Sequence, residues 1–228
     1  MKKLIILIVL LLGQTVYGLT PDQQKLMNNL QNGTEQQITE LLKTIPDVNF
    51  VASKNRTPLI YAAAYRNIPA VKLLLQKKAK TDVGDSRKKT ALIYAAKNSN
   101  DNTELINILI QAGANINQPD QNKWTPLMHA ARTGHANNVK KLLELKAEET
   151  LQDNKGNTAL MHAVIGADEG DKNRYTEQIK DLSQNSNVIN LKNKYHRTAA
   201  EVAKNRGLLK FWNEHSSSPY SWDDDFDW

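Results

Sequence analysis

The chain has 228 residues, 40% of them hydrophobic and 24% charged, and 30 Lys and Arg residues against 24 Asp and Glu residues give it a formal net charge of +6. This composition is typical of a globular protein with one or two cores, and it excludes collagen-like and wholly disordered chains. The lack of cysteine excludes disulfide bonds, thiolate metal sites and a thiol nucleophile.

The first eighteen residues have the pattern of an export signal. Two lysines precede an unbroken apolar run over residues 4–12, which is about half as long as a membrane-spanning helix. Gly18, with Val16 two residues before it, is typical of a signal peptidase site, so cleavage is predicted after Gly18. An uncleaved N-terminal anchor is the alternative. The short Leu and Ile core favours a bacterial signal, so we expect a soluble periplasmic protein.

Two helix starts follow the signal. Thr20 and Thr34 each have a Gln three residues later, which is the spacing of a capping box. The helix pair that they begin is more polar than the helices farther along the chain. Such a pair suits the N-terminal end of a stacked array, where the outer side must face water.

A seven-residue block then recurs along the chain. Its copies begin at Thr57, Thr90, Thr125 and Thr158, with intervals of 33, 35 and 33 residues, and a degenerate copy begins at Thr198 after 40 more. The third copy reads Thr-Pro-Leu-Met-His-Ala-Ala. The period of about 33 residues and this T-P-L-H-x-A core closely resemble the ankyrin repeat.

The ankyrin resemblance covers about residues 20–212 and implies an all-α ankyrin repeat solenoid, in which helix pairs are joined by hairpin-like loops. The leading Thr is expected to cap the first helix, Pro suits the first turn, and the Ala pair lets neighbouring helices approach closely. Second helices are indicated by apolar residues three and four apart, as at Val139, Leu142 and Leu143.

The repeats set the expected boundaries. We predict a signal peptide over residues 1–18, an ankyrin domain over 19–215 with an N-terminal cap at 20–50, repeats from about 51, 84, 119 and 152, a degenerate repeat at 190–215, and a C-terminal tail over 216–228. Leu208 to Trp212 are expected to close the array with a final helix.

The period slips inside the second and fourth repeats, between their paired helices. The extra residues fall near 98–102 and 168–173, which predicts loops at one edge of the array. The second insertion is acidic and faintly resembles a calcium loop, but the ligand ladder with its terminal bidentate Glu is missing. A solvated loop is expected there.

The five histidines do not form a catalytic or metal-binding pattern. His129 and His162 occupy the His position of the block, where the resemblance implies a hydrogen bond between repeats. Motifs for a nucleophile elbow, a phosphate loop, a zinc protease or a carboxylate pair are lacking. The sequence therefore predicts a non-enzymatic binding protein with no metal and no cofactor.

The loop tips between repeats, here called fingers, hold the first candidate binding residues. In the ankyrin family the fingers and inner helices meet the partner, and these tips are basic through Arg56, Arg87, Lys88 and Lys123. The alternative is that the cations only keep the protein soluble. Trp124 and Tyr195 also fall in fingers, and we predict them as partner anchors, with packing against the next finger as the alternative.

The family's turn position is filled by Gly only at Gly156. Asn55, Lys88, Lys123 and His196 take that position in the other fingers. A left-handed backbone there is cheap for Asn and costs more for Lys and His.

The end of the sequence concentrates aromatic and acidic side chains. The candidate binding residues in this tail are Tyr220, Trp222, Asp223, Asp224, Asp225, Phe226, Asp227 and Trp228. Two uses remain open, because the tail can fold back along the basic fingers or insert into a partner whose rim the fingers hold. In the second case the indole and terminal carboxylate of Trp228 would occupy a peptidase cleft.

An exported ankyrin array with such a tail resembles the periplasmic ankyrin self-protection proteins of predatory bacteria, which inhibit peptidoglycan DD-endopeptidases and carboxypeptidases. The resemblance implies an inhibitor whose protein partner is a peptidase of the penicillin-binding type. Other periplasmic ankyrin proteins resemble scaffolds, so a scaffold for an envelope enzyme such as a catalase is the alternative. We expect a monomer until complexed, no nucleic-acid partner, and no membrane span after cleavage.

Overall fold

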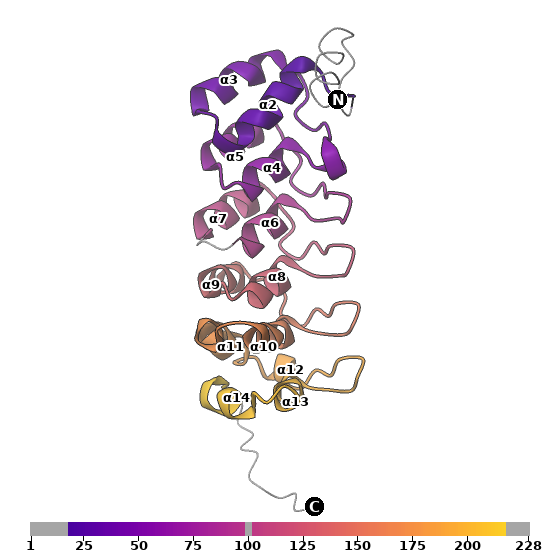
Figure 1. Ribbon diagram of the computed structural model, residues 1–228, viewed down its shortest axis with the longest axis vertical. Coiled ribbons are helices and arrows are strands. Elements are labelled where there is room, and N and C mark those ends of the chain that lie inside the picture. The colour runs from indigo at the N-terminus through magenta and orange to yellow at the C-terminus, as the bar shows by residue number, and fades with distance from the viewer. Residues whose placement is uncertain (1–17, 99–101, 218–228) are drawn as a thin grey trace, which may run out of the picture. The chain divides into compact units, whose positions relative to one another are not determined.

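The computed structural model describes residues 18–98 and 102–217 (Figure 1). The predicted export signal up to Tyr17 and the tail from Ser218 onward lie outside the described residues, as do residues 99–101 of the first insertion. Contacts divide the chain into two compact units, one up to Ala91 and one from Leu92 onward. All regular elements in the described ranges are helices, which confirms the all-α prediction.

The first unit is built from two helix pairs. Its elements are α2 (Pro21–Asn32), α3 (Glu35–Thr44), the 3-10 turn η2 (Ser53–Asn55), α4 (Pro58–Ala64) and α5 (Ile68–Gln76). Helix α2 packs on α3 and α4, and α3 packs on α5. Both predicted capping boxes are present, with the Thr20 and Thr34 hydroxyls accepting from the backbone N–H of Gln23 and Gln37.

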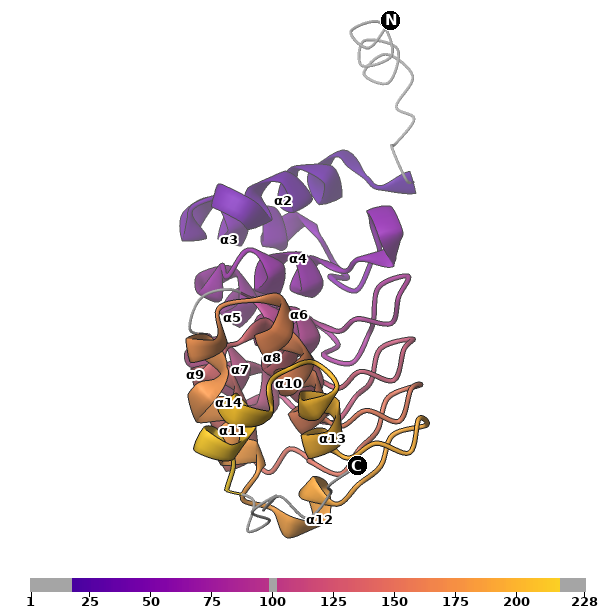
Figure 2. The ribbon, with the colours of Figure 1, turned by 60° about the horizontal axis from the view of Figure 1, so that its bottom comes forward.

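The second unit repeats this arrangement in two layers. Its elements are α6 (Ala91–Lys97), which begins at the boundary, α7 (Thr103–Gln111), α8 (Pro126–Thr133), α9 (Ala136–Glu144), α10 (Ala159–Glu169), η3 (Lys172–Tyr175), α11 (Thr176–Leu182), α12 (Ser186–Ile189), α13 (Ala199–Lys204) and α14 (Leu209–His215). An inner layer forms where α10 packs between α8 and α13. The outer layer runs through α7, α9, α11 and α14 (Figures 1 and 2).

The seven-residue block that begins each repeat explains why the repeat forms a helix pair. The Thr125, Thr158 and Thr198 hydroxyls accept from the backbone N–H three residues later, as predicted. The small Ala130 and Ala163 side chains are fully buried, so neighbouring inner helices approach closely. Leu and Val at the core positions of the block are buried too, and each contributes about 1.5–3 kcal/mol of burial free energy.

The end of the second unit is closed by α14, as predicted. Trp212 is 1% exposed and Leu208 2%, so the last helix covers the apolar face of its neighbours. Among the residues that the structure describes, no helix combines the length and apolar character that crossing a bilayer requires.

Residues 168–173 of the second insertion are exposed, as predicted, but part of the insertion is helical rather than an irregular loop. Helix α10 continues through Asp168 and Glu169, and η3 then buries Tyr175 at 5% exposure. The Tyr175 hydroxyl donates to the Arg132 carbonyl at 3.2 Å, and its ring lies over Gly166, where an added Cβ would come within 2.4 Å of it. The insertion therefore extends α10, and Tyr175, which follows the insertion, braces the neighbouring repeat because Gly166 leaves room for its ring.

Candidate protein-binding surface

The fingers of the second unit are held by one side chain at a fixed place. Asp120, Asp153 and Asn193 each stand five residues before the Thr of their repeat. The Oδ1 atom of each accepts hydrogen bonds from the backbone N–H groups of the second and fourth residues after it, at 2.8–3.2 Å. This side chain closes the finger as an Asx turn does, so the tip is held by more than its own backbone.

The backbone of the tip adopts the left-handed conformation that the sequence predicted. Within the second unit, Lys123, Gly156 and His196 have φ of 61°, 76° and 58°, and Asn55 and Lys88 of the first unit have 55° and 59°. This conformation costs conformational free energy for a residue other than glycine. Because Lys and His are held there, their side chains stand at the tip of the finger.

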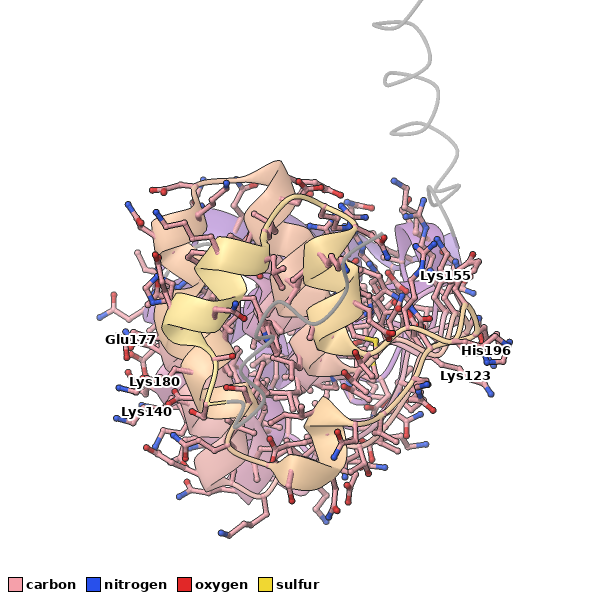
Figure 3. All side chains as sticks on the ribbon, turned by 90° about the horizontal axis from the view of Figure 1, so that it is seen from below. Lys123, Lys140, Lys155, Glu177, Lys180 and His196 are labelled. Carbon is pink, nitrogen blue, oxygen red and sulfur yellow. The ribbon has the colours of Figure 1, made fainter. Side chains whose placement is uncertain are left out.

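Neighbouring fingers of the second unit are also joined to one another. The backbone N–H of Asn154 donates to the Asn122 carbonyl at 3.1 Å, and that of Lys194 donates to the Lys155 carbonyl at 3.0 Å. Figure 3 shows Lys123, Lys155 and His196 at one edge of the unit, opposite Lys140 and Lys180 of the outer helices. The basic tips are therefore a fixed row, and a partner that binds them orders little of the loop backbone.

Two buried histidine–aspartate pairs support the third and fourth fingers. The Oδ2 atoms of Asp120 and Asp153 lie 3.1 and 3.0 Å from Nε2 of His129 and His162. Burial alone would raise the pKa of each carboxyl, but the hydrogen bonds from the histidine and from the backbone outweigh it and lower the pKa of both. The pairs therefore hold ionised carboxylates inside the repeat.

The expected role of His162 is corrected by this geometry. The hydrogen bond of His162 joins it to the finger of its own repeat, and its Nδ1 atom has no hydrogen-bond partner in the described part of the chain. The bond between repeats that the family resemblance implied is therefore absent at His162. At His129 the Nε2 bond likewise stays within the repeat.

Trp124 packs across these two histidines. Its ring centroid lies 4.0 Å from that of His162 and 5.1 Å from that of His129. The side chain is half-buried, so one part of the indole bridges two repeats and another part faces solvent. Trp124 forms the wall of a cavity and does not protrude from the finger.

Two adjoining cavities follow the inner side of the fingers in the second unit. The first, of about 390 Å³, includes Trp124, and the second, of about 360 Å³, includes Tyr195. They share four lining residues, so we treat them as one surface and call it the groove. Side chains that line the groove include Trp124, Arg132, Lys155, Ile165, Glu169, Tyr195, Arg197 and Arg206.

Charged side chains of the groove are paired at its inner edge and free at its finger edge. Arg132 pairs with Glu169 and Arg206 with Asp168, so ion pairs connect the inner layer at α8, α10 and the end of α13. The hydrogen bond from Arg132 lowers the pKa of Glu169. Lys155 and Arg197 are exposed and have no ion pair within the described ranges. The finger edge therefore presents positive charge to an incoming partner.

Comparison with known families agrees with this architecture. The family model for ankyrin repeats (3 copies) matches residues 26–120 and 95–171, which together exceed half of the chain. The chain belongs to the ankyrin repeat family. No curated protein matches it. Ankyrin repeats are protein-interaction modules and are typically non-enzymatic scaffolds, so a protein is the expected kind of partner.

The other predicted binding residues differ in their exposure and in the unit to which they belong. Tyr195 is 62% exposed at the rim of the groove, and Lys123 is exposed at its tip. Arg87 and Lys88 are exposed on the first unit, where Arg56 is half-buried with its guanidinium carbon 5.6 Å from the Tyr61 ring centroid. The structure thus brings Trp124 and Tyr195 to one groove, and the predicted tail residues lie outside the described residues.

Sequence reasoning missed the inner half of this ankyrin surface. Arg132, Glu169 and Arg206 were not predicted as groove residues. The insertion that contains Asp168 and Glu169 was expected to form a loop, so their ion pairs with Arg206 and Arg132 were not foreseen. The supporting Asp was also missed, although it stands five residues before the repeat Thr, and the His nine residues after it is its partner. In the described residues, no group of three or more His, Asp or Glu side chains is placed to hold a metal ion.

Proposed function

We propose that this ankyrin protein is an exported inhibitor of a peptidoglycan DD-endopeptidase or carboxypeptidase of the penicillin-binding type. The observation that carries the binding role is the groove of the second unit, whose fingers are fixed by Asp side chains and by bonds between tips. The periplasmic setting and the peptidase target are supported by the signal-like N-terminal pattern and by the aromatic and acidic side chains of residues 220–228.

The groove supports inhibition by occlusion. Tyr195 offers a rigid aromatic anchor that loses little entropy on binding, and Lys155 and Arg197 beside it offer charge for an acidic rim. Trp124 is held against two histidines, so it serves as a fixed wall. A partner seated on this surface would have its active-site mouth covered by the fingers, and residues 220–228 could then enter the cleft.

The direct test is inhibition of purified enzymes. Each DD-peptidase from the envelope of the cells that encode this chain is titrated with the full-length protein, and hydrolysis of a peptidoglycan peptide is followed. We expect stoichiometric loss of activity for one of them. A Tyr195→Ala, Arg197→Gln variant should bind at least about tenfold more weakly, since buried aromatic and Arg anchors dominate interfaces.

A Lys140→Gln variant is the matched control, because it removes a cation from the outer edge of the same unit (Figure 3). It should inhibit like the unmodified protein. Full peptidase activity at excess inhibitor for every enzyme contradicts the proposal. Stable binding to a catalase without effect on any peptidase would favour the scaffold alternative.

A further inference from the structure

We propose that, in the free protein, the segment from residue 218 to 228 docks in the end of the chain's own groove beside Tyr195, and that a partner must displace it. This inference concerns the protein without a partner, and it holds whether or not the partner is a peptidase.

The starting point of this segment is fixed in the second unit. The backbone N–H of Ser217 donates to the Ser183 hydroxyl at 2.7 Å, and the Ser217 hydroxyl donates to the Lys180 carbonyl at 3.4 Å. These contacts hold Ser217, the last described residue, against the end of α11. The segment therefore leaves the unit from the outer layer, next to α14, which follows α13 at the end of the array.

The segment is long enough to reach the groove. Eleven residues follow Ser217, and an extended chain of that length spans about 36 Å. The path from the outer layer to the inner side crosses α14 and α13, and two packed helices are about 20 Å across. About five residues at the end of the segment can therefore lie in the groove.

The groove end that the segment reaches first suits aromatic side chains. Its cavity of about 360 Å³ is within the size range of small ligand sites. Tyr195 stands at its rim with 62% of its surface exposed, and the half-buried apolar side chain of Ile165 lines the same cavity. A ring from Phe226 or Trp228 can pack against the Tyr195 ring and cover this apolar surface.

Opposite charges also favour docking of the segment at this end of the groove. Lys155 and Arg197 line this end of the groove without an ion pair in the described part of the chain, and Arg206 is exposed beside them. Residues 220–228 supply four Asp side chains and no cation. At the outer edge where the segment begins, Lys140 and Lys180 stand near the acidic Glu177 and Asp181, which offset their charge.

A tethered segment needs only weak contacts to stay in place. Its covalent attachment gives the docking step an effective concentration in the millimolar range. Ordering the segment opposes docking, so the docked state is held weakly and a partner that binds the groove can displace it. Folding back on the chain's own groove and insertion into a partner are then successive states of the same segment.

The test uses the full-length chain, whose lack of cysteine allows a single pair to be introduced. Asp227→Cys is combined with Asn205→Cys, an exposed position lining the groove end, and the pair is treated with a short bismaleimide. The control pairs Asp227→Cys with Lys140→Cys, which lies on the same edge as Lys180 and hence near the exit point (Figure 3). Intramolecular cross-links are quantified by peptide mapping.

We expect the Asn205 pair to cross-link about tenfold more than the Lys140 pair, as local docking raises the effective concentration. The excess should fall in 1 M salt, where the screening length is about 3 Å. It should also fall when Asp223, Asp224 and Asp225 are changed to Asn in the same chain. Equal cross-linking of the two pairs, an excess at Lys140, or cross-links found only between molecules would each overturn the proposal.

Discussion

Counted along the chain, the third finger (residues 120–124) and the fifth (residues 193–197) look alike in sequence, since each adds one aromatic residue to a basic tip. The two aromatic residues nevertheless have different surroundings. Trp124 directly precedes its repeat Thr and is covered by His162 of the next repeat. Tyr195 stands three residues before its Thr, next to the left-handed residue His196, and is 62% exposed. Trp124 therefore supports the array, whereas Tyr195 faces solvent.

The supporting side chains differ in the same way. The third and fourth fingers have an ionised Asp paired with a buried His, whereas the fifth has the neutral Asn193, whose Nδ2 donates to Asn157 at 2.9 Å. The third and fourth fingers are thus tied into the core of their own repeats. The fifth is tied to its neighbouring finger through Asn193 and Lys194, and its Tyr195 is exposed.

The largest expected effect separates the two aromatic residues by stability. Trp124→Ala should lower the free energy of unfolding by about 3 kcal/mol, because it removes a ring packed on two buried histidines. Tyr195→Ala should change it by no more than about 0.5 kcal/mol, since the side chain is on the surface. Urea unfolding followed by circular dichroism measures both. Trp124→Phe is the control that keeps a ring, and equal losses for Trp124→Ala and Tyr195→Ala would contradict the assignment.

The second expected effect concerns the fourth finger. Asp153→Ala should cost about 2 kcal/mol, because it leaves His162 and two backbone N–H groups without their acceptor. Asn193→Ala should cost less, as no buried histidine depends on it. The same urea experiment compares them. A larger loss for Asn193→Ala would show that the histidine pair does not hold the finger.

The fingers should also differ in how their stability depends on pH. The pKa values of Asp120 and Asp153 are lowered in the folded protein, so the stability that these carboxylates add is present above the unfolded value of 3.8 and is lost as pH falls through their folded pKa. Asn193 does not titrate. Unfolding free energy should therefore fall less steeply below about pH 4 in an Asp153→Asn variant than in the unmodified protein. Parallel slopes would contradict this role of Asp153.

The smallest expected effect lies at the tip of the fifth finger. His196 has φ of 58°, so His196→Gly should stabilise the protein by about 0.5 kcal/mol through relief of backbone strain. Gly156 already fills the same position in the fourth finger, and Gly156→Ala should destabilise the protein. Thermal unfolding of the two variants in one buffer gives the comparison. A destabilising His196→Gly would mean that the imidazole makes contacts that outweigh the strain.

Prediction from sequence succeeded where one residue acts on its own backbone. Thr20, Thr34 and Thr125 cap helices as their spacing indicated, and the left-handed positions fell where the family turn requires them. It failed where the outcome depends on a neighbouring repeat. Whether Trp124 is covered, and whether Asp168 stays helical, depends on side chains more than thirty residues away, such as His162 and Arg206.

The most direct test of the account measures two properties of one variant. Partner affinity and unfolding free energy are determined side by side for Tyr195→Ala, once a partner has been found by the inhibition assay. We predict that affinity falls at least about tenfold while stability stays within about 0.5 kcal/mol of the unmodified protein. Unchanged affinity would contradict the claim that the rim of the groove binds the partner.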